Sequence, residues 1–166
     1  MLLLLWRHGP AGDATEWARS GQDDATRPLT PEGRVKTRRA AKGLSTLIES
    51  LDVVAMSPLT RARETARFAA ARFPKARRAV RAELLPSADP RRAARWLAGL
   101  DAKTVLLVGH EPQLSRLGAL LLTGSDAPLF ELKKGGAAFI ELGPKRLSAL
   151  LPPKALRALA TRAGKR

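Results

Sequence analysis

The 166-residue sequence predicts an α/β protein, a three-layer α/β/α sandwich whose central sheet is mostly parallel. The first observation is a set of continuous apolar runs at residues 2–6, 53–56 and 104–109, which is typical of strands covered on both faces. The second observation is that a helical pattern follows each run before the next one begins. Parallel strands end at one edge of a sheet, and sheets of this kind place their sites at that edge.

The first expected strand is Leu2–Trp6. Residues 11–30, "AGDATEWARSGQDDATRPLT", are polar and interrupted by glycine, which indicates a long loop. Thr30 then provides an N-cap and Pro31 a first helical position. Apolar residues at helical spacing continue as far as Ile48, so a helix is expected here.

The remaining expected elements continue this alternation. In chain order they are a strand at Val53–Met56, a helix at 60–73, a short strand at Val80–Leu85, a helix from Asp89-Pro90, a strand at Thr104–Gly109, a helix at 112–122, a strand at 137–142 and a terminal amphipathic helix after Pro152-Pro153. The sequence contains neither an internal repeat nor a low-complexity linker. We therefore expect a single domain over residues 1–166.

The composition excludes several kinds of chemistry. The chain has no cysteine, so disulfides, thiolate nucleophiles and cysteine-ligated metals are excluded. It has no apolar stretch of about 18 residues, which a spanning helix needs. The N-terminal leucine run is too short for a signal peptide and lacks a basic lead-in. These features predict a cytoplasmic protein with no membrane association.

The charge is strongly positive. Thirty Lys and Arg residues against fifteen Asp and Glu residues give +15, with a sequence pI near 11.5. Such a balance favours an anionic partner: nucleic acid, an acidic protein or a phosphorylated substrate. A solvated, arginine-rich surface is the alternative explanation, so the charge alone does not identify the function.

Both histidines of the chain follow the carboxyl ends of expected strands. His8 stands in "WRHG" and His110 in "VGHEP", while "SPLTRARET" follows the second strand and places Arg61 on the first turn of a helix. A single histidine or arginine in such a place usually has a structural role. Together, however, three strand ends bring two imidazoles and the guanidiniums of Arg7 and Arg61 to one edge of the sheet. This combination indicates a site that binds an anion and reacts with it.

These motifs resemble those of the histidine phosphatase superfamily, which has the phosphoglycerate-mutase-like fold. "RHG" at 7–9, "SPLTRARET" at 57–65 and "GHEP" at 109–112 occur in the order and spacing of that family. The resemblance extends from Leu2 to about Leu142. It implies a histidine phosphatase domain.

Two further segments resemble the SixA-type phosphohistidine phosphatases within this superfamily. They are "RPLTPEG" at residues 27–33 and the late "LKKGGAAFIEL". The short course from Ala82 to the Pro90 helix leaves no room for the lid insertion of larger mutases and sugar phosphatases. The resemblance therefore implies a domain with no lid insertion.

Phosphoryl transfer explains why arginine and glycine are needed here. The nonbridging oxygens of a phosphoryl group must be held by cations. Arg7 and Arg61 can each donate two planar hydrogen bonds to such oxygens, which lysine cannot do. Arg27 is a candidate third guanidinium, although it could instead support the loop. Gly9 is expected to let the backbone come close to the bound anion.

The two histidines are assigned different tasks. A neutral His8 imidazole can attack phosphorus if one ring nitrogen is bare and the other donates to a nearby backbone carbonyl. His110 is expected to be protonated beside the phosphoryl dianion and to stabilise the transition state electrostatically. Ser57 lies at a strand–helix turn and is interpreted as a helix-start residue rather than a nucleophile.

Glu83 is a candidate general acid. Many relatives use a glutamate after the third strand to protonate an alkoxide leaving group. In "AELLPSAD", however, Glu83 stands early for that position, which Leu85-Pro86 occupy, so a structural or surface carboxylate is the alternative interpretation. A missing acid would slow hydrolysis of alkyl phosphates. It would matter less for phosphohistidine, whose imidazole can leave already protonated.

The leading hypothesis is a phosphatase that hydrolyses protein phosphohistidine through a covalent intermediate on His8. The first alternative is a broad phosphomonoesterase on small phosphorylated metabolites, with Glu83 or His110 as proton donor. The second is a polyanion-binding module, for which an aromatic content of 4% offers few stacking residues. No cofactor or metal is expected, because two histidines without an i, i+4 pair or clustered acids do not form a ligand set.

Overall fold

The central sheet has the strand order β3-β2-β4-β1-β5-β6 in the computed structural model, which describes residues 1–162. β1, β2, β3 and β4 pair in parallel, and the hairpin of β5 and β6 adds two antiparallel strands next to β1. The strands are β1 (Leu2–Arg7), β2 (Val53–Met56), β3 (Arg77–Val80), β4 (Thr104–Gly109), β5 (Ala137–Glu141) and β6 (Arg146–Leu151). The sheet is mostly parallel, as the sequence predicts.

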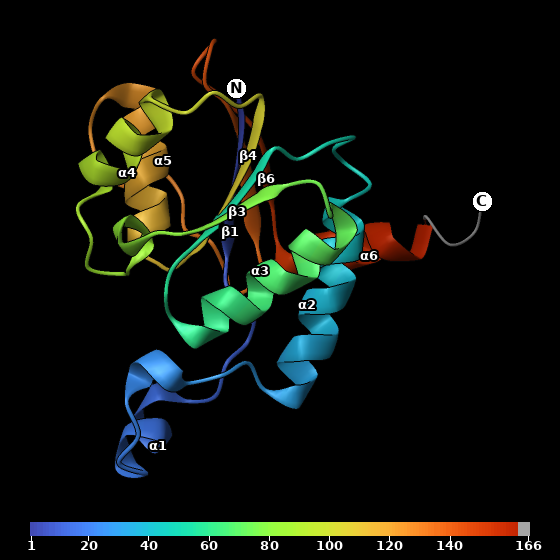
Figure 1. Ribbon diagram of the computed structural model, residues 1–166, viewed down its shortest axis with the longest axis vertical. Coiled ribbons are helices and arrows are strands. Elements are labelled where there is room, and N and C mark those ends of the chain that lie inside the picture. Colours follow the sequence, from blue (N-terminus) through green and yellow to red (C-terminus); the bar gives the residue numbers. More distant parts are fainter. Residues whose placement is uncertain (163–166) are drawn as a thin grey trace.

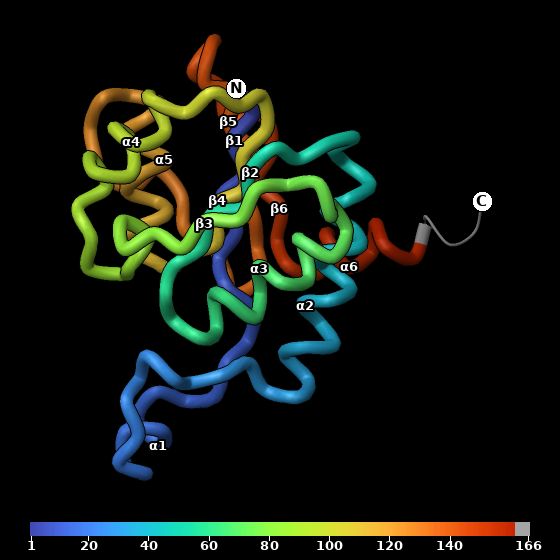
Figure 2. The backbone as a smooth tube through the Cα atoms, in the orientation of Figure 1, coloured from blue at the N-terminus to red at the C-terminus, as the bar shows by residue number. Residues whose placement is uncertain are grey.

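Helices cover both faces of this sheet and produce three layers (Figure 1). Figure 2 shows α2, α3 and α6 on one side of the strands and α4 and α5 on the other. These helices are α2 (Pro31–Leu44), α3 (Thr60–Arg72), α4 (Pro90–Ala98), α5 (Gln113–Thr123) and α6 (Pro153–Arg162). The predicted α/β/α sandwich with a mostly parallel sheet is thus confirmed.

The apolar strands divide their side chains between two hydrophobic cores. In β1, Leu4 and Trp6 join the core under α2, α3 and α6, whereas Leu3 and Leu5 join the core under α4 and α5. All four are fully buried. Burial of each such leucine contributes about 1.5–3 kcal/mol, so a continuous apolar run is required when both faces are covered.

Side-chain caps fix the start of two helices where the sequence predicts them. The Thr30 hydroxyl accepts a hydrogen bond from the Gly33 amide at the start of α2, and Pro31 occupies the first turn. The Asp89 carboxylate accepts from the Arg91 amide at the start of α4. Each cap satisfies an amide that would otherwise lack an intrahelical partner.

Four local features differ from the sequence prediction. Helix α2 ends at Leu44, although the apolar spacing continues as far as Ile48. The short strand lies at Arg77–Val80 rather than at Val80–Leu85, and a 3₁₀ turn, η2 (Ala82–Leu84), follows it. Strand β6 and helix α1 (Ala14–Arg19) were not predicted. β3 and β6 are the edge strands, and their exposed side chains lack the apolar pattern that marks a buried strand.

The carboxyl edge of the parallel strands is where the chain makes its largest excursion from the sheet. Residues 8–30 extend beyond this edge with α1 and the 3₁₀ turn η1 (Asp24–Thr26), at the bottom of Figure 1. Residues 81–89 link β3 to α4 with only η2 between them, so the absence of a lid insertion there is confirmed. Across residues 1–162, no helix has the length and hydropathy that crossing a membrane requires.

Candidate active site

Three adjacent strands end at the candidate site. His8 follows β1, Ser57 follows β2 and His110 follows β4, and the order β2-β4-β1 makes these strands neighbours. The His8 amide donates to the Gly109 carbonyl at 3.0 Å. As a result, the ring centroids of His8 and His110 lie 4.9 Å apart, although 102 residues separate them in the chain. The structure therefore brings the two predicted imidazoles together.

The surroundings of His8 fix which of its ring nitrogens is bare. Its Nδ1 lies 2.7 Å from the Gly9 carbonyl oxygen. A carbonyl can only accept, so Nδ1 carries the proton and Nε2 keeps a lone pair. Burial is the main cause that lowers the pKa of His8 well below its usual range, and the neighbouring His110 lowers it further. His8 is therefore a neutral imidazole at pH 7, as a nucleophile must be.

His110 is also neutral with the groups that surround it. Burial, and then the positive charge of Arg61, lower the pKa of His110 to about 3. Its Nε2 lies 2.9 Å from the Ser57 hydroxyl, whereas its Nδ1 is buried and has no partner among the described residues. The surrounding protein groups thus favour a neutral His110, whereas the sequence analysis expects a protonated one beside a phosphoryl dianion. The negative charge of a phosphoryl group would be needed to raise this pKa.

Arg7 is held by the segment that precedes β5. One terminal nitrogen of Arg7 donates to the Leu132 carbonyl at 2.6 Å. The Leu132 amide in turn donates to the Glu111 carboxylate at 3.0 Å, and the Ser115 hydroxyl donates to the same carboxylate. Glu111 directly follows His110, so this chain of contacts connects the backbone beside His110 to the guanidinium of Arg7.

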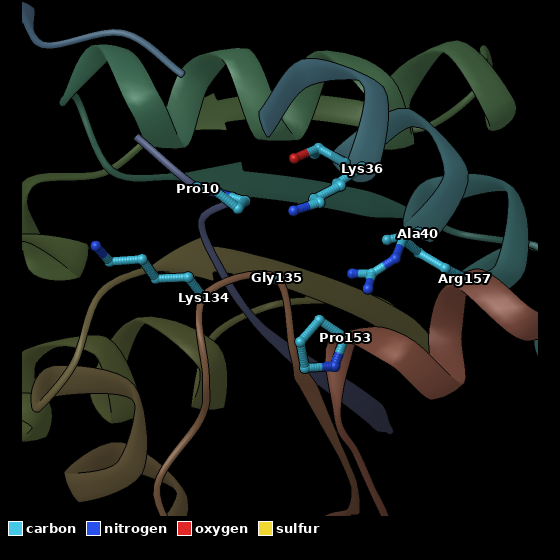
Figure 3. Close-up of a pocket in the computed structure, with 8 residues that line it drawn as sticks. Pro10, Lys36, Ala40, Lys134, Gly135, Pro153 and Arg157 are labelled. Atoms are coloured by element: carbon cyan, nitrogen blue, oxygen red, sulfur yellow. The ribbon is translucent and has the colours of Figure 1, made fainter. Parts of the chain in front are cut away.

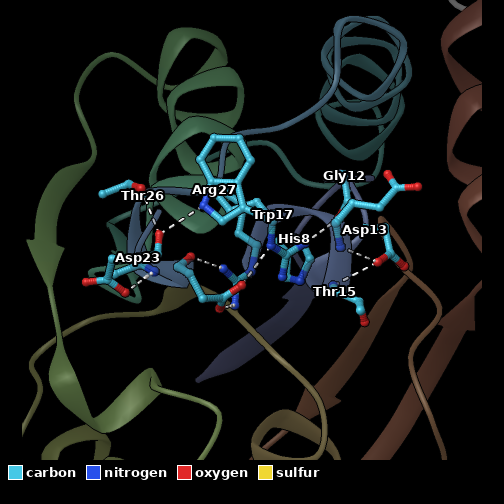
Figure 4. A network of polar contacts seen from close by, with 12 residues as sticks. His8, Gly12, Asp13, Thr15, Trp17, Asp23, Thr26 and Arg27 are labelled. Carbon is cyan, nitrogen blue, oxygen red and sulfur yellow. Dashed lines mark hydrogen bonds and ion pairs between the residues drawn. The ribbon is translucent and has the colours of Figure 1, made fainter. Parts of the chain in front are cut away.

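Arg61 and Arg27 meet at a single carboxylate, that of Asp24. Arg61 contacts Asp24 twice, at the backbone oxygen (2.9 Å) and at Oδ2 (3.0 Å). Arg27 donates from Nε to Asp24 Oδ1 at 2.7 Å and from a terminal nitrogen to the Gly12 carbonyl. Figure 4 shows this Arg27 network beside His8. Arg27 therefore lies close to Arg61. Its bonds to Gly12 and Asp24 also connect the two ends of the loop that precedes it.

Several buried donors remain unpaired around the two imidazoles. Within residues 1–162, five buried side-chain polar atoms have no protein partner, and three of them are Arg7 Nε, Arg61 Nε and His110 Nδ1. Buried polar groups are nearly always hydrogen-bonded in native proteins. Nitrogen atoms with no partner on two guanidiniums and an imidazole fit an oxyanion that accepts from all three.

Gly9 has packing and hydrogen-bond contacts that the sequence did not predict. Its amide donates to the Thr65 hydroxyl at 3.0 Å, so this N–H is not available to an anion. A Cβ on Gly9 would lie 1.9 Å from Thr37 Oγ1 of α2. The structure therefore gives a packing reason for this glycine, because α2 packs directly on the backbone beside His8.

Glu83 is held as a carboxylate by its own surroundings. Arg81 donates to its Oε1 at 2.8 Å, and the guanidinium of Arg81 stacks over Trp96. A hydrogen bond from the backbone amide of Glu83 and the charge of Arg81 lower the pKa of Glu83. A general acid needs a raised pKa, so these contacts favour the structural reading of Glu83 over proton donation.

A small basic crevice lies next to the segment that follows β1 (Figure 3). It lies between Pro10, Gly135, α2 and α6, and it is lined by Lys36, Lys134 and Arg157. The Gly135 amide donates to the backbone oxygens of Arg7 and His8, so the crevice adjoins the site. One of these cations, Lys36, forms an ion pair with Glu32 at 2.6 Å. No group of three or more possible metal-ligating side chains was found within residues 1–162.

Comparison with known proteins identifies the class of this chain. The profile of the histidine phosphatase superfamily (branch 1) matches residues 3–85, which is half of the sequence. The chain belongs to this superfamily and is a phosphatase of that class. It is also 33% identical over 157 residues to an uncharacterized protein of Picosynechococcus sp., a match that covers 90% of each chain.

Two solved structures illustrate the range of similar proteins. The protein histidine phosphatase SixA complexed with tungstate has a TM-score of 0.78 and 26% identity, over 94% of this chain and 99% of that one. The α-ribazole phosphatase of Shigella flexneri has a TM-score of 0.69 and 21% identity, over 92% of this chain and 97% of that one. The second match shows the common fold alone.

Sequence reasoning missed three residues that hold the site together. Asp24, Glu111 and Thr65 bind Arg61, Leu132 and Gly9 respectively. Asp24 stands three residues before Arg27, a spacing at which an ion pair can form in a helical turn, and this was the one local signal. Glu111 and Thr65 stand within the recognised motifs, but their partners are distant in the chain.

Proposed function

We propose that this phosphatase hydrolyses protein phosphohistidine, with His8 as the nucleophile. The phosphoryl group would lie in an oxyanion cup, by which we mean the side chains of Arg7, Arg61 and His110. Arg27 would lie at the rim of this cup. The unpaired buried donors on Arg7, Arg61 and His110 carry this proposal, because they surround a neutral imidazole whose Nε2 is bare. The similarity to SixA, a protein histidine phosphatase seen with the oxyanion tungstate, supports it.

In the first step, the lone pair of His8 Nε2 forms a bond to phosphorus while the N–P bond of the substrate breaks. A phosphohistidine that carries a proton on its other ring nitrogen leaves as neutral imidazole, so no proton donor is required. The guanidiniums and His110 hold the nonbridging oxygens throughout. This chemistry suits a site whose nearby carboxylate, Glu83, is engaged by Arg81.

In the second step, water attacks phosphorus and the His8–phosphorus bond breaks. Both protons of the water leave with the phosphate, and Nε2 regains its lone pair. The Gly9 carbonyl keeps the proton of His8 on Nδ1 in both steps, so the tautomer does not change.

A substrate panel tests the choice of substrate. We expect kcat/KM for a phosphohistidine protein to exceed that for phosphoserine, a sugar phosphate and phosphoglycerate by at least about 100-fold, since only the imidazole leaves without a proton donor. Equal or faster turnover of the alkyl phosphates would reject phosphohistidine as the substrate. That result would favour a broad phosphomonoesterase.

A further inference from the structure

Asp24 is an unusual carboxylate because it sits among the cations of the proposed cup while half of its side chain is open to solvent. The Arg61 and Arg27 side chains that it binds are 5% and 8% exposed, whereas Asp24 itself is 52% exposed. Partial burial works against its ionisation, but hydrogen bonds and charges from the two arginines lower the pKa of Asp24. It is therefore a carboxylate that bridges two guanidiniums at pH 7.

The atoms that Asp24 contacts leave one edge of Arg61 unoccupied. A guanidinium has five N–H donors arranged as two forked edges. Asp24 binds both terminal nitrogens of Arg61, one through its backbone oxygen and the other through Oδ2. The Nε of Arg61 is buried and has no partner among residues 1–162. Asp24 thus occupies the outer end of the guanidinium and leaves the Nε edge for another acceptor.

We propose that Asp24 is a positioning residue, which holds Arg61 with its Nε edge toward the phosphoryl group and couples Arg27 to the same arrangement. This inference depends on the oxyanion cup of the proposed function. Asp24 does not contact the reacting atoms and acts through Arg61. The backbone oxygen and the side chain of Asp24 both contact the terminal nitrogens of Arg61. Asp24 therefore also links η1 to α3.

The positioning role predicts an effect opposite in sign to simple electrostatics. Removing a negative charge from the neighbourhood of a phosphate should strengthen phosphate binding if charge alone matters. Removing the anchor of Arg61 should weaken binding, because a bidentate contact depends on the orientation of the guanidinium. The sign of the change therefore separates the two roles.

The test is the affinity for inorganic phosphate and for tungstate, measured by calorimetry on the full chain, in wild type and Asp24→Asn. We expect Asp24→Asn to bind both anions about 10-fold more weakly and to lose a similar factor in kcat/KM. Asp24→Glu, which restores the charge, should recover part of both losses. Unchanged or tighter anion binding in Asp24→Asn would overturn the proposal.

Asp23→Asn is the matched control, because it removes the same charge one residue away. Asp23 caps η1 through its side chain, a task that asparagine also performs, and it does not contact Arg61 in the described structure. We expect Asp23→Asn to keep the wild-type affinity for phosphate. An equal loss in both variants would show a general effect of loop charge and would contradict a specific role of Asp24.

A double-mutant cycle tests whether Asp24 acts through Arg61. Lysine at position 61 has no forked edge to orient, so Asp24→Asn should cost little further affinity in an Arg61→Lys background. Fully additive losses would refute the coupling. Wild type that bound neither anion would instead refute the cup itself, and with it both proposals, whereas failure of Asp24→Asn alone to weaken binding would refute only the role of Asp24.

Discussion

His8 and His110 have the same side chain but different hydrogen-bond partners, and these partners set their chemistry. The Gly9 carbonyl forces the proton of His8 onto Nδ1, while the Ser57 hydroxyl beside His110 can donate or accept. Burial is the main cause that lowers the pKa of both rings. At the scale of single residues, the site therefore contains a neutral imidazole of fixed tautomer beside a second imidazole whose tautomer is not fixed by its partner.

These pKa values predict an unusual titration. Both folded-state pKa values lie below that of an unfolded histidine, so neither ring should take up a proton as the pH falls from about 8 to about 5. The chain has two histidines, so both can be followed by imidazole NMR. A ring that titrates near its ordinary value would show that the site is more open to water than the structure indicates.

Addition of phosphate provides the comparison within the same experiment. A dianion next to the partnerless Nδ1 should raise the pKa of His110, since an adjacent opposite charge favours the protonated ring. The His8 tautomer should stay the same, because its Nδ1 bond to Gly9 is within the backbone turn.

At the scale of elements, the site depends on how α2 packs against the segment after β1. Gly9 and Thr37 are in such close contact that a Cβ on the glycine would lie 1.9 Å from the threonine hydroxyl. The same Gly9 carbonyl orients His8, and its amide binds Thr65 of α3. Two helices on one face of the sheet thus determine where the His8 imidazole lies.

We predict that Gly9→Ala costs about 1–3 kcal/mol of stability through overpacking and lowers kcat by displacing His8. Gly12→Ala is the control, since a Cβ at that position meets no atom within 4 Å. Thermal unfolding and initial rates measure both effects. The stability loss caused by Gly9→Ala should be smaller in a Thr37→Ala background. An unchanged loss would show that the contact with Thr37 is not its cause.

The sequence predicted best those elements whose signal is local. β1, β2 and β4 are buried on both faces, so their apolar runs mark them directly. β6 and β3 lie at the edges of the sheet, where exposed polar residues interrupt the apolar run that marks a buried strand. Their bounds therefore depend on pairing with a neighbouring strand, which a single sequence does not display.

The candidate site shows the same division between local and long-range information. The identities of Arg7, His8, Arg61 and His110 come from short motifs, and the structure gathers these residues at one edge. The second layer of contacts, such as Asp24 to Arg61 and Glu111 to Leu132, joins segments that are distant in the chain. Only the folded arrangement shows that these carboxylates serve the arginines.

At the scale of the whole molecule, the chain carries a strong excess of positive charge. Lys and Arg outnumber Asp and Glu by 30 to 15, so at least half of the basic residues have no acid with which to pair one to one. Arg7 and Arg61 place part of this charge beside both imidazoles, whose pKa values are lowered mainly by burial and further by these two cations. A positive field of this kind raises the local concentration of anionic substrates and weakens with salt.

We propose above that His8 accepts the phosphoryl group within the cup of Arg7, Arg61 and His110. Rapid quenching of the enzyme with a radiolabelled phosphohistidine donor, followed by mapping of the labelled peptide, tests this role of His8. We predict an acid-labile label on His8 in wild type, and no label in His8→Asn although that variant still binds phosphate. A label on another residue, or one retained in His8→Asn, would show that His8 is not the phosphoryl acceptor.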